Sequence, residues 1–566
     1  MNLLIFVLFS TFASFSNAGP IVNVKYGKIE GFEHTSPTGH VSEVFLAVPF
    51  AKPPIGDLRF ERPEEPEHWE DVYQATQFRN DCTPHYSLVA TFSHYSGEDC
   101  LTLNIIKPKT VSGKLPVLFW VHGGGYSIGS ASQHGYQVFA DKYVPKGVIV
   151  VTIQYRLGFM GFFTQGKSGN MGLFDQAAAL RFVHENIDNF GGDKCKITIW
   201  GYSAGGASVS QLTISPYTRD LYDKAIVMSA SSYAGWATGA EIENHSKELA
   251  EALNCDWNDA IECMKSKSVE EIFSAVDKIG YTTQNIDSIK WSPIIDGDFL
   301  PAHPDELLSQ SPVKPTLIGL SSKEGTYFTT MNLGRVLSTF AVTKEDCEKI
   351  DEKFVLNFIK NKILYNNRFG SKSDNALKKI SEFYLRRNRP EHLEGNAFFL
   401  DAYAQLVSDI FFNVPVIRDI IRRVELNTPI WAYKFECFDD AIWHDHIPKS
   451  IRGSPHANEY HYLFDLPLIA NIDTSKGKPK EIQENLIDMV VSFAKNGRPE
   501  IQNIRWNPVN NSDEINYLSF TQNGLTLNNG DYFEENTSFW NNLREDLGLD
   551  VVDPTSTRKN REKTEL

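Results

Sequence analysis

The chain has 566 residues, of which 42% are hydrophobic, and this is enough apolar material to bury a large core. Its 55 basic and 71 acidic residues give a formal net charge of -16 at pH 7, which repels nucleic acid and anionic membrane surfaces. The composition therefore indicates a globular protein and argues against nucleic acid as its partner.

The first eighteen residues have the pattern of a secretory signal peptide. An apolar stretch from Leu3 to Phe9 is followed by small residues, with Ser16 and Ala18 at the spacing of a signal-peptidase site. We therefore expect residues 1–18 to be removed by cleavage after Ala18. Because the apolar stretch is too short to span a bilayer and no later segment has the pattern of a membrane span, we expect no integral membrane anchor.

Short apolar runs without polar alternation recur along the chain and predict strands that are buried on both faces. They are found at 116–121, 148–153, 197–200, 225–228, 316–320 and 430–435. A stretch at 173–187 has the pattern of a helix, and helices between such strands predict an α/β fold with a large, mostly parallel central sheet and helices on both faces. With no repeat and no long linker, residues 19–552 are expected to form a single domain, followed by a polar tail at 553–566.

Seven cysteines predict two short disulfide loops and no metal site. Cys82 and Cys100, and likewise Cys255 and Cys263, are close enough in sequence to close short loops. Because the count is odd, at least one cysteine is expected to stay unpaired in an oxidising compartment. No His or Cys cluster has the spacing of metal ligands, so we expect no structural metal.

The first motif that carries chemistry is a run of glycines, 123–125, which follows the predicted strand that ends at Val121. These glycines can present backbone N–H groups with no side chain in the way. No Gly-Lys-Ser/Thr follows them and the spacing of a dinucleotide site is absent, which argues against a phosphate-binding loop. Upstream of a G-x-S-x-G motif, the run is typical of an oxyanion hole.

The second motif is the G-x-S-x-G at 201–205, which lies between a short predicted strand and a helix expected to start at about Ala204. Such a sharp turn strains the backbone of Ser203, and the flanking glycines leave room because they carry no Cβ. The hydroxyl then stands at the carboxyl end of the strand, beside unpaired N–H groups of the helix, which stabilise a developing oxyanion. Ser203 is therefore our candidate nucleophile.

A serine nucleophile needs a base, and the base needs an acid that orients it. Glu324 follows the predicted strand at 316–320, and it is our candidate acid because sites in open α/β sheets form at the carboxyl ends of strands. Five histidines follow Glu324, and spacing alone does not choose among the last four. A loop marked by glycine and proline favours His456 as the base. The histidines after Glu324 are His392 and these four, His444, His446, His456 and His461.

Taken with other motifs in the same order, these residues resemble the type-B carboxylesterase and cholinesterase family of α/β hydrolases. The further motifs are YGKIEGF, VPFAKPPIGDLRF at 48–60, EDCLTLNI at 98–105, FGGD at 190–193, KEGTYF and PHANEYHYLF. They cover most of the mature chain. The resemblance implies the α/β-hydrolase fold and a carboxylic ester hydrolase that needs no cofactor and works through an acyl-enzyme intermediate.

The resemblance also implies a role for particular residues. It makes Ser203 the nucleophile, Glu324 the triad acid and His456 the base. It assigns the oxyanion hole to the backbone N–H groups of Gly124, Gly125 and Ala204. It further implies the disulfides Cys82–Cys100 and Cys255–Cys263, and the structural ion pairs Arg59–Glu98 and Arg156–Asp175.

The sequence departs from the family pattern in three places, and two of these departures bear on the substrate. Tyr202 stands where the family usually has a glutamate, which removes a negative charge beside the nucleophile. The loop between the first two cysteines has no tryptophan of the kind that holds a choline ammonium in cholinesterases. We therefore expect a neutral, apolar ester as substrate. The third departure is Ala457 and Asn458, which stand where glycine and aspartate commonly follow the histidine, and its effect stays open.

Two signals concern the secretory pathway. N-x-S/T triplets at Asn244, Asn510 and Asn536 are acceptor sequences for N-glycosylation. The last four residues, KTEL, resemble the Lys-Asp-Glu-Leu retrieval signal, with Thr564 in place of the acidic residue. The tail favours retention in the lumen of the endoplasmic reticulum over secretion.

Two other functions compete with a broad carboxylesterase. One is a cholinesterase-like adhesion protein, which keeps the fold as a binding surface without turnover; the retained triad residues and the absence of a membrane-spanning stalk in the sequence argue against it. The other is a narrow esterase for a lipid-like signalling ester, which the sequence leaves open.

Overall fold

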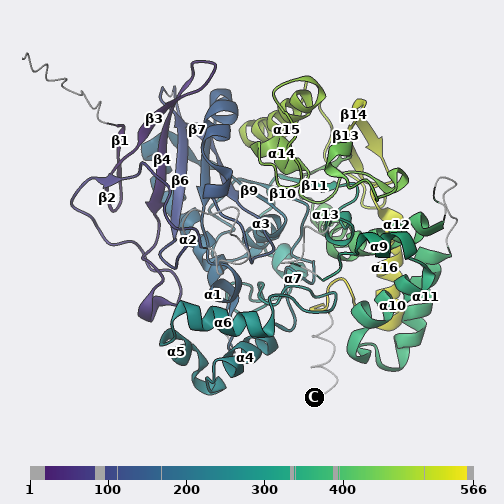
Figure 1. The fold of residues 1–566 in the computed structure, drawn as a ribbon. Helices are drawn as coiled ribbons and strands as arrows, with labels where there is room; N and C mark the ends of the chain where they lie inside the picture. The colour runs from purple at the N-terminus through teal and green to yellow at the C-terminus, as the bar shows by residue number, and fades with distance from the viewer. Residues whose placement is uncertain are drawn as a thin grey trace, which may run out of the picture.

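The computed structural model describes residues 19–82, 96–110, 112–166, 168–331, 337, 339–386, 393, 395–502 and 504–556. These residues form an 11-stranded sheet with helices on both sides and a small 3-stranded sheet near the N-terminus (Figure 1). In spatial order the large sheet contains β14 (Gly524–Asn529), β13 (Asn516–Thr521), β12 (Ile430–Phe435), β11 (Thr316–Ser321), β10 (Lys224–Met228), β9 (Gly192–Tyr202), β7 (Leu115–Val121), β8 (Ile149–Ile153), β6 (Thr102–Pro108), β4 (Val41–Pro49) and β3 (Phe32–Thr35). The small sheet contains β1 (Ile21–Val24), β2 (Gly27–Glu30) and β5 (Tyr73–Gln74).

The centre of the large sheet is parallel and its two edges are antiparallel. Every neighbouring pair from β13 to β8 is parallel, whereas β14 at one edge and β6, β4 and β3 at the other pair antiparallel. The six predicted strands are β7 to β12, so the expected α/β sheet is confirmed. Because these strands are parallel, the carboxyl ends of β7, β9, β10 and β11 lie at the same end of the sheet, where a site can form.

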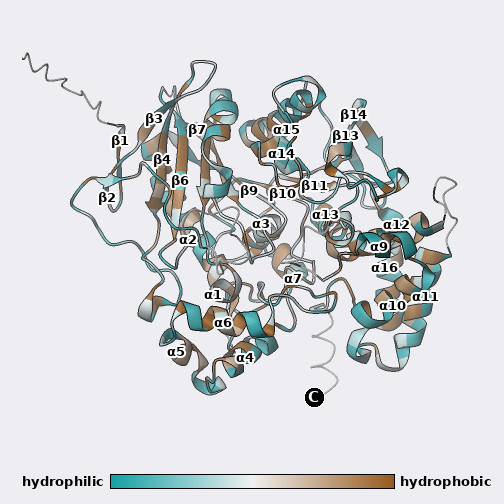
Figure 2. Cartoon of the chain, in the orientation of Figure 1, coloured by the Kyte–Doolittle hydropathy of each residue, from teal (hydrophilic) through white to brown (hydrophobic). Residues whose placement is uncertain are grey.

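Strand β7 shows why the predicted runs lack polar alternation. Val117, Phe119 and Val121 pack into the core on one face of the sheet, and Leu118 and Trp120 pack into the core on the other. All five side chains are fully buried. A strand covered on both faces is apolar at every position, and Figure 2 accordingly shows hydrophobic strands at the centre of the molecule.

Helices cover both faces of the sheet. The core on one face includes α2 (Met171–Asn186), α3 (Ala204–Ile214) and α13 (Val414–Glu425), and the core on the other includes α14 (Glu459–Phe464) and α15 (Gly477–Asn496). The predicted helix at 173–187 is α2. The other α-helices are α1 (Gly158–Phe162), α4 (Ile242–Ala252), α5 (Ala260–Lys265), α6 (Val269–Ile279), α7 (Pro304–Ser309), α8 (Thr326–Thr329), α9 (Lys344–Lys349), α10 (Glu352–Phe358), α11 (Ser373–Leu385), α12 (Gly395–Ser408) and α16 (Glu534–Leu547).

The packed part of the chain continues beyond the expected domain boundary at 552. Asp553 is buried, and its Oδ2 lies 2.8 Å from Nε2 of His303. The rest of the expected tail, 557–566, and the expected signal peptide, 1–18, lie outside the described residues. Among the helices that the structure describes, none has both the length and the apolar content needed to cross a bilayer.

Candidate active site

Ser203 lies in the sharp turn between β9 and α3, in the strained backbone conformation that the sequence predicts. Its φ is +56° and its ψ is -127°. A Cβ on Gly201 would meet the carbonyl oxygen of Gly205 at 2.2 Å, and a Cβ on Gly205 would meet the carbonyl oxygen of Val121 at 2.1 Å. Only glycine fits at these two positions, so the motif is a steric requirement of the turn.

Three side chains from distant parts of the chain form one hydrogen-bonded series. Oγ of Ser203 lies 2.8 Å from Nε2 of His456, and Nδ1 of His456 lies 2.6 Å from Oε2 of Glu324. His456 and Glu324 are buried, whereas Ser203 keeps partial exposure. This is the arrangement in which an imidazole removes the proton of a hydroxyl while a carboxylate stabilises the imidazolium.

The carboxylate of Glu324 is held by two donors that sequence reasoning missed. The hydroxyl of Ser229 and the backbone N–H of Ser321 each donate to Oε1 of Glu324 at 2.7 Å. Because both bonds use Oε1, Oε2 is directed at His456. Ser229 directly follows β10 and Ser321 ends β11, and nothing in their local sequence marks either residue.

Among the described residues, His456 is the histidine that lies within hydrogen-bond distance of Oγ of Ser203. His461 is buried, and burial lowers its pKa to about 4. His444 and His446 stack on each other with their ring centroids 5.5 Å apart. His392 lies outside the described residues.

The glycine run at 123–125, predicted to form the oxyanion hole, approaches Ser203 with its backbone. Gly124 and Gly125 have positive φ values of 114° and 58°, and a Cβ on Gly124 would meet the carbonyl oxygen of Ile128 at 2.1 Å. Among the described residues, no hydrogen-bond acceptor is found for the N–H groups of these two glycines. Ala204 is the first residue of α3, so its N–H has no carbonyl partner within the helix. These N–H groups suit an anionic ligand.

Apolar side chains lie beside His456 and Gly125. The ring of Phe412 stacks on His456 with centroids 4.4 Å apart, and the ring of Phe328 lies 5.6 Å from the same imidazole. A Cβ on Gly125 would meet side-chain carbons of Leu337 at 2.5 Å and of Ile289 at 3.4 Å. This environment shields His456 from water and suits uncharged groups.

Two of the departures from the family pattern are in direct contact. Tyr202 is fully buried, and its hydroxyl donates to Oε2 of Glu459 at 2.9 Å and accepts the N–H of Ala457 at 2.7 Å. The hydroxyl of Ser321 also donates to Oε2 of Glu459 at 2.9 Å. Burial, and then the charge of Glu324, raise the pKa of Glu459 to about 8. Sequence reasoning assigned no role to Glu459.

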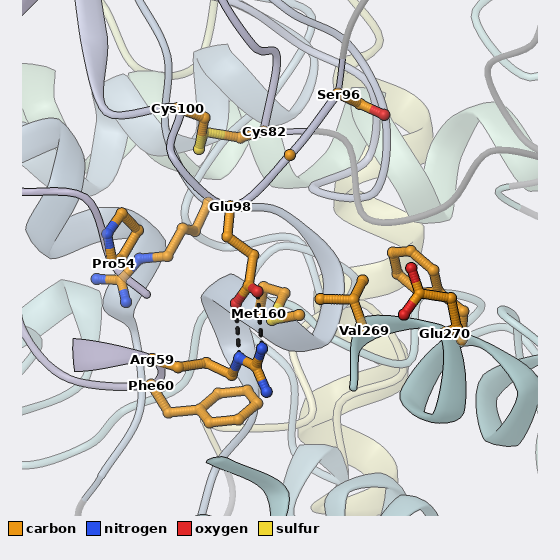
Figure 3. Close-up of a pocket in the computed structure, with 13 residues that line it drawn as sticks. Pro54, Arg59, Phe60, Cys82, Ser96, Glu98, Cys100, Met160, Val269 and Glu270 are labelled. Carbon is orange, nitrogen blue, oxygen red and sulfur yellow. Dashed lines mark hydrogen bonds and ion pairs between the residues drawn. A yellow bond between two sulfur atoms is a disulfide. The ribbon is translucent and has the colours of Figure 1, made fainter. Parts of the chain in front are cut away.

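The first disulfide and the first implied ion pair line one pocket, whose lining residues do not include Ser203 (Figure 3). Cys82 is bonded to Cys100. Below this bond in the view, Nε and Nη2 of Arg59 donate to the two carboxylate oxygens of Glu98 at 2.6 and 2.7 Å. The two charges are paired with each other, as the resemblance implies for a structural ion pair.

The second implied ion pair and the second disulfide are also present. Nε and Nη2 of Arg156 each donate to the carboxylate of Asp175 at 2.8 Å. Cys255 is bonded to Cys263. Two disulfides are typical of proteins of the secretory pathway. The free cysteines are the exposed Cys195 and the buried Cys347 and Cys437.

The three predicted glycosylation acceptors differ in their surroundings. Asn244 and Asn510 are exposed. Asn536 is half-buried, and its Nδ2, the atom that would carry a glycan, donates to Oδ2 of Asp409 at 2.6 Å. Within the described residues, no group of three or more His, Cys, Asp or Glu side chains is placed to hold a metal ion.

Comparison with known proteins identifies the family of this chain. Residues 18–540 match the model of the carboxylesterase family. Gut esterase 1 of Caenorhabditis briggsae is 60% identical over 97% of each chain, and carboxylesterase 1C of Rattus norvegicus is 31% identical over 92% of this chain and 91% of the relative. Acetylcholinesterase of Bungarus fasciatus is 30% identical over 84% of this chain and 78% of the relative. The chain therefore belongs to the carboxylesterase family, which includes the cholinesterases, and it is an enzyme that hydrolyses carboxylic esters.

Proposed function

We propose that Ser203, His456 and Glu324 are the catalytic triad of an esterase that acts on neutral, apolar carboxylic esters. The observation that carries this assignment is the hydrogen-bonded series from Oγ of Ser203 through both nitrogens of His456 to Oε2 of Glu324. A serine hydroxyl is a weak nucleophile until an adjacent base takes its proton, and this series supplies the base and its orienting acid.

The reaction has two acyl-transfer steps. Oγ of Ser203 attacks the ester carbonyl carbon while Nε2 of His456 takes the hydroxyl proton, and the carbonyl electron pair moves onto oxygen. When the C–O bond to the alcohol breaks, His456 returns that proton to the leaving oxygen. Water then attacks the acyl-enzyme in the same way, His456 again transfers the proton, and the carboxylic acid leaves Ser203 free.

The N–H groups of Gly124, Gly125 and Ala204 stabilise the negative oxygen of each tetrahedral intermediate. Two features support this role: the glycine backbone lies against the turn that carries Ser203, and the N-terminal end of α3 has a positive dipole. Fixed donors of this kind stabilise charge that develops only in the transition state, so they raise the rate rather than the affinity.

An uncharged substrate is supported by the apolar side chains at the site. Phe412 and Phe328 lie beside His456, and Leu337 lies beside Gly125. The 60% identical relative is named a gut esterase, and we accordingly propose that this enzyme cleaves esters during digestion or detoxification.

We also place the enzyme in the secretory pathway, with removal of residues 1–18 and retention through the C-terminal KTEL. Deletion of residues 563–566 should increase the amount of enzyme in the culture medium relative to the cell lysate. Equal secretion with and without these residues would mean that the protein is exported rather than retained.

The triad is tested by labelling with an organophosphate and by turnover of p-nitrophenyl esters with short and medium acyl chains. We expect a phosphoryl adduct on Ser203 by mass spectrometry, and loss of both adduct and turnover in Ser203→Ala. A folded wild-type protein with neither adduct nor turnover would refute the esterase and favour the cholinesterase-like binding protein.

A further inference from the structure

The backbone directly after His456 is held in an unfavourable conformation. Ala457 has φ +67°, in the left-handed region that suits glycine and disfavours residues with a Cβ. Ala457 is also 6% exposed, so its N–H cannot exchange a protein partner for bulk water without rearrangement. A conformation of this kind persists only where the surroundings impose it.

A single side chain accepts the hydrogen bond from the N–H of this strained residue. The hydroxyl of Tyr202 accepts the N–H of Ala457 at 2.7 Å and donates to Glu459 at 2.9 Å. Tyr202 is the last residue of β9 and directly precedes Ser203. The residue before the nucleophile is therefore bonded to the residue after the base.

Other contacts fix the loop on both sides of Ala457 but not its own N–H. The N–H of His456 donates to the carbonyl of Glu324 at 3.3 Å, and the side-chain amide of Asn458 donates to the carbonyl of Cys437 at 2.8 Å. The bond from Ala457 to Tyr202 thus secures the one residue of this stretch whose backbone conformation is unfavourable. Without this hydrogen bond, the strained backbone of Ala457 is free to adopt a more favourable conformation, which turns His456 away from Ser203.

We propose that Tyr202 is a positioning residue, whose hydroxyl holds Ala457 in the left-handed conformation and so keeps His456 aimed at Ser203. This role rests on the proposed function, because it concerns the geometry of the triad. Tyr202 does not touch the reacting atoms through its hydroxyl; it acts through the backbone next to the base.

The test compares Tyr202→Phe, Ala457→Gly and the double variant with the wild type. Tyr202→Phe should lower kcat about tenfold with KM changed less than about twofold, because a small misalignment of a catalytic group lowers the rate without removing substrate contacts. In the Ala457→Gly background, Tyr202→Phe should lower kcat less than about threefold, since glycine adopts the left-handed conformation without strain.

Tyr433→Phe is the matched control. Tyr433 is a fully buried tyrosine whose hydroxyl has no hydrogen-bond partner among the described residues, and kcat of this variant should equal that of the wild type. An equal loss of kcat from Tyr202→Phe in both backgrounds, a rise in KM alone, or no loss at all would overturn the proposal.

A crystal structure of Tyr202→Phe separates this proposal from the esterase assignment, because it requires no turnover. We expect Ala457 to leave φ +67° and the distance between Nε2 of His456 and Oγ of Ser203 to lengthen. An unchanged φ would overturn the positioning role whether or not the wild type hydrolyses esters. An inactive wild type in the same assays would refute the proposed function instead.

Discussion

The imidazole of His456 stacks on the ring of Phe412, with centroids 4.4 Å apart and planes inclined by 29°. Phe412 belongs to a π-helical turn, Asp409–Asn413, between α12 and α13. Such turns are rare and are often found at functional sites, because the extra residue redirects a side chain. Here the turn places an aromatic ring over His456, the proposed base, where it limits rotation of the imidazole and excludes water.

Phe412→Ala should therefore lower kcat about tenfold, since a mobile and hydrated base transfers protons less effectively. Phe411→Ala is the control, because Phe411 is equally buried in the same turn but its ring does not stack on His456. Each variant should lose about 3 kcal/mol of stability through the cavity it creates. Equal kcat values at a temperature where both remain folded would show that the stacking has no role in catalysis.

Gly124→Ala should abolish most of the activity by deforming the oxyanion loop. The new Cβ would lie 2.1 Å from the carbonyl oxygen of Ile128, so the backbone must move. Loss of one oxyanion donor lowers kcat by about 100- to 1000-fold, and kcat for a p-nitrophenyl ester is the measurement. Gly39→Ala controls for alanine at positive φ, since Gly39 has φ +83° and no atom within 4 Å of the new Cβ. Similar kcat losses in both variants would exclude a specific role of the loop.

Glu459 should make stability depend on pH. Its carboxyl has a pKa of 4.5 as an ordinary group and of about 8 in the folded protein, because it is buried beside the charge of Glu324. The folded chain thus keeps a proton that the unfolded chain releases between these values. The protonated carboxyl of Glu459 therefore contributes its full stabilisation of the folded state below pH 4.5. As the pH rises from there through about 8, the free energy of unfolding falls by about 1.4 kcal/mol per pH unit.

Glu459→Gln is the variant that tests this dependence, because it keeps the shape of the side chain and cannot ionise. From pH 4.5 to about 8, the free energy of unfolding of the wild type should fall relative to that of Glu459→Gln. Glu484→Gln removes an exposed carboxylate of α15 and serves as control. A constant difference between wild type and Glu459→Gln would mean that Glu459 is ionised throughout this range.

The sequence predicts the central strands better than those toward one edge of the sheet. Strand β6 is buried at every position, yet Asn104 and Lys107 interrupt its apolar pattern. Asn104 accepts the N–H of Ala47 and donates to Thr152, both at 2.9 Å, and Lys107 forms an ion pair with Glu43. These partners come from β4 and β8, so a local pattern does not reveal that the polar side chains are satisfied.

The candidate site likewise contains residues that local sequence predicts and residues that only distant contacts reveal. Ser203 is predictable because the turn that strains it is encoded by its immediate neighbours. His456 is separated from Ser203 by 253 residues, and spacing therefore left four histidines open. Ser229 and Glu459 carry no local signal, because each contributes only through a contact that the assembled strands and loops create.

Glycosylation should distinguish the three acceptor asparagines. A glycan on Asn536 would replace one of the two hydrogens on the nitrogen that donates to Asp409, a fully buried carboxylate. Leaving a buried carboxylate with fewer donors is costly, and α16 would have to move to admit the sugar. We therefore expect peptide mass spectrometry of the protein, expressed through the secretory pathway, to find glycans on the exposed Asn244 and Asn510 and none on Asn536. Asn536→Gln should leave the glycosylated mass unchanged, whereas Asn244→Gln should lower it by one glycan. Full occupancy of Asn536 would contradict this expectation and show that the folded enzyme admits a glycan at this position.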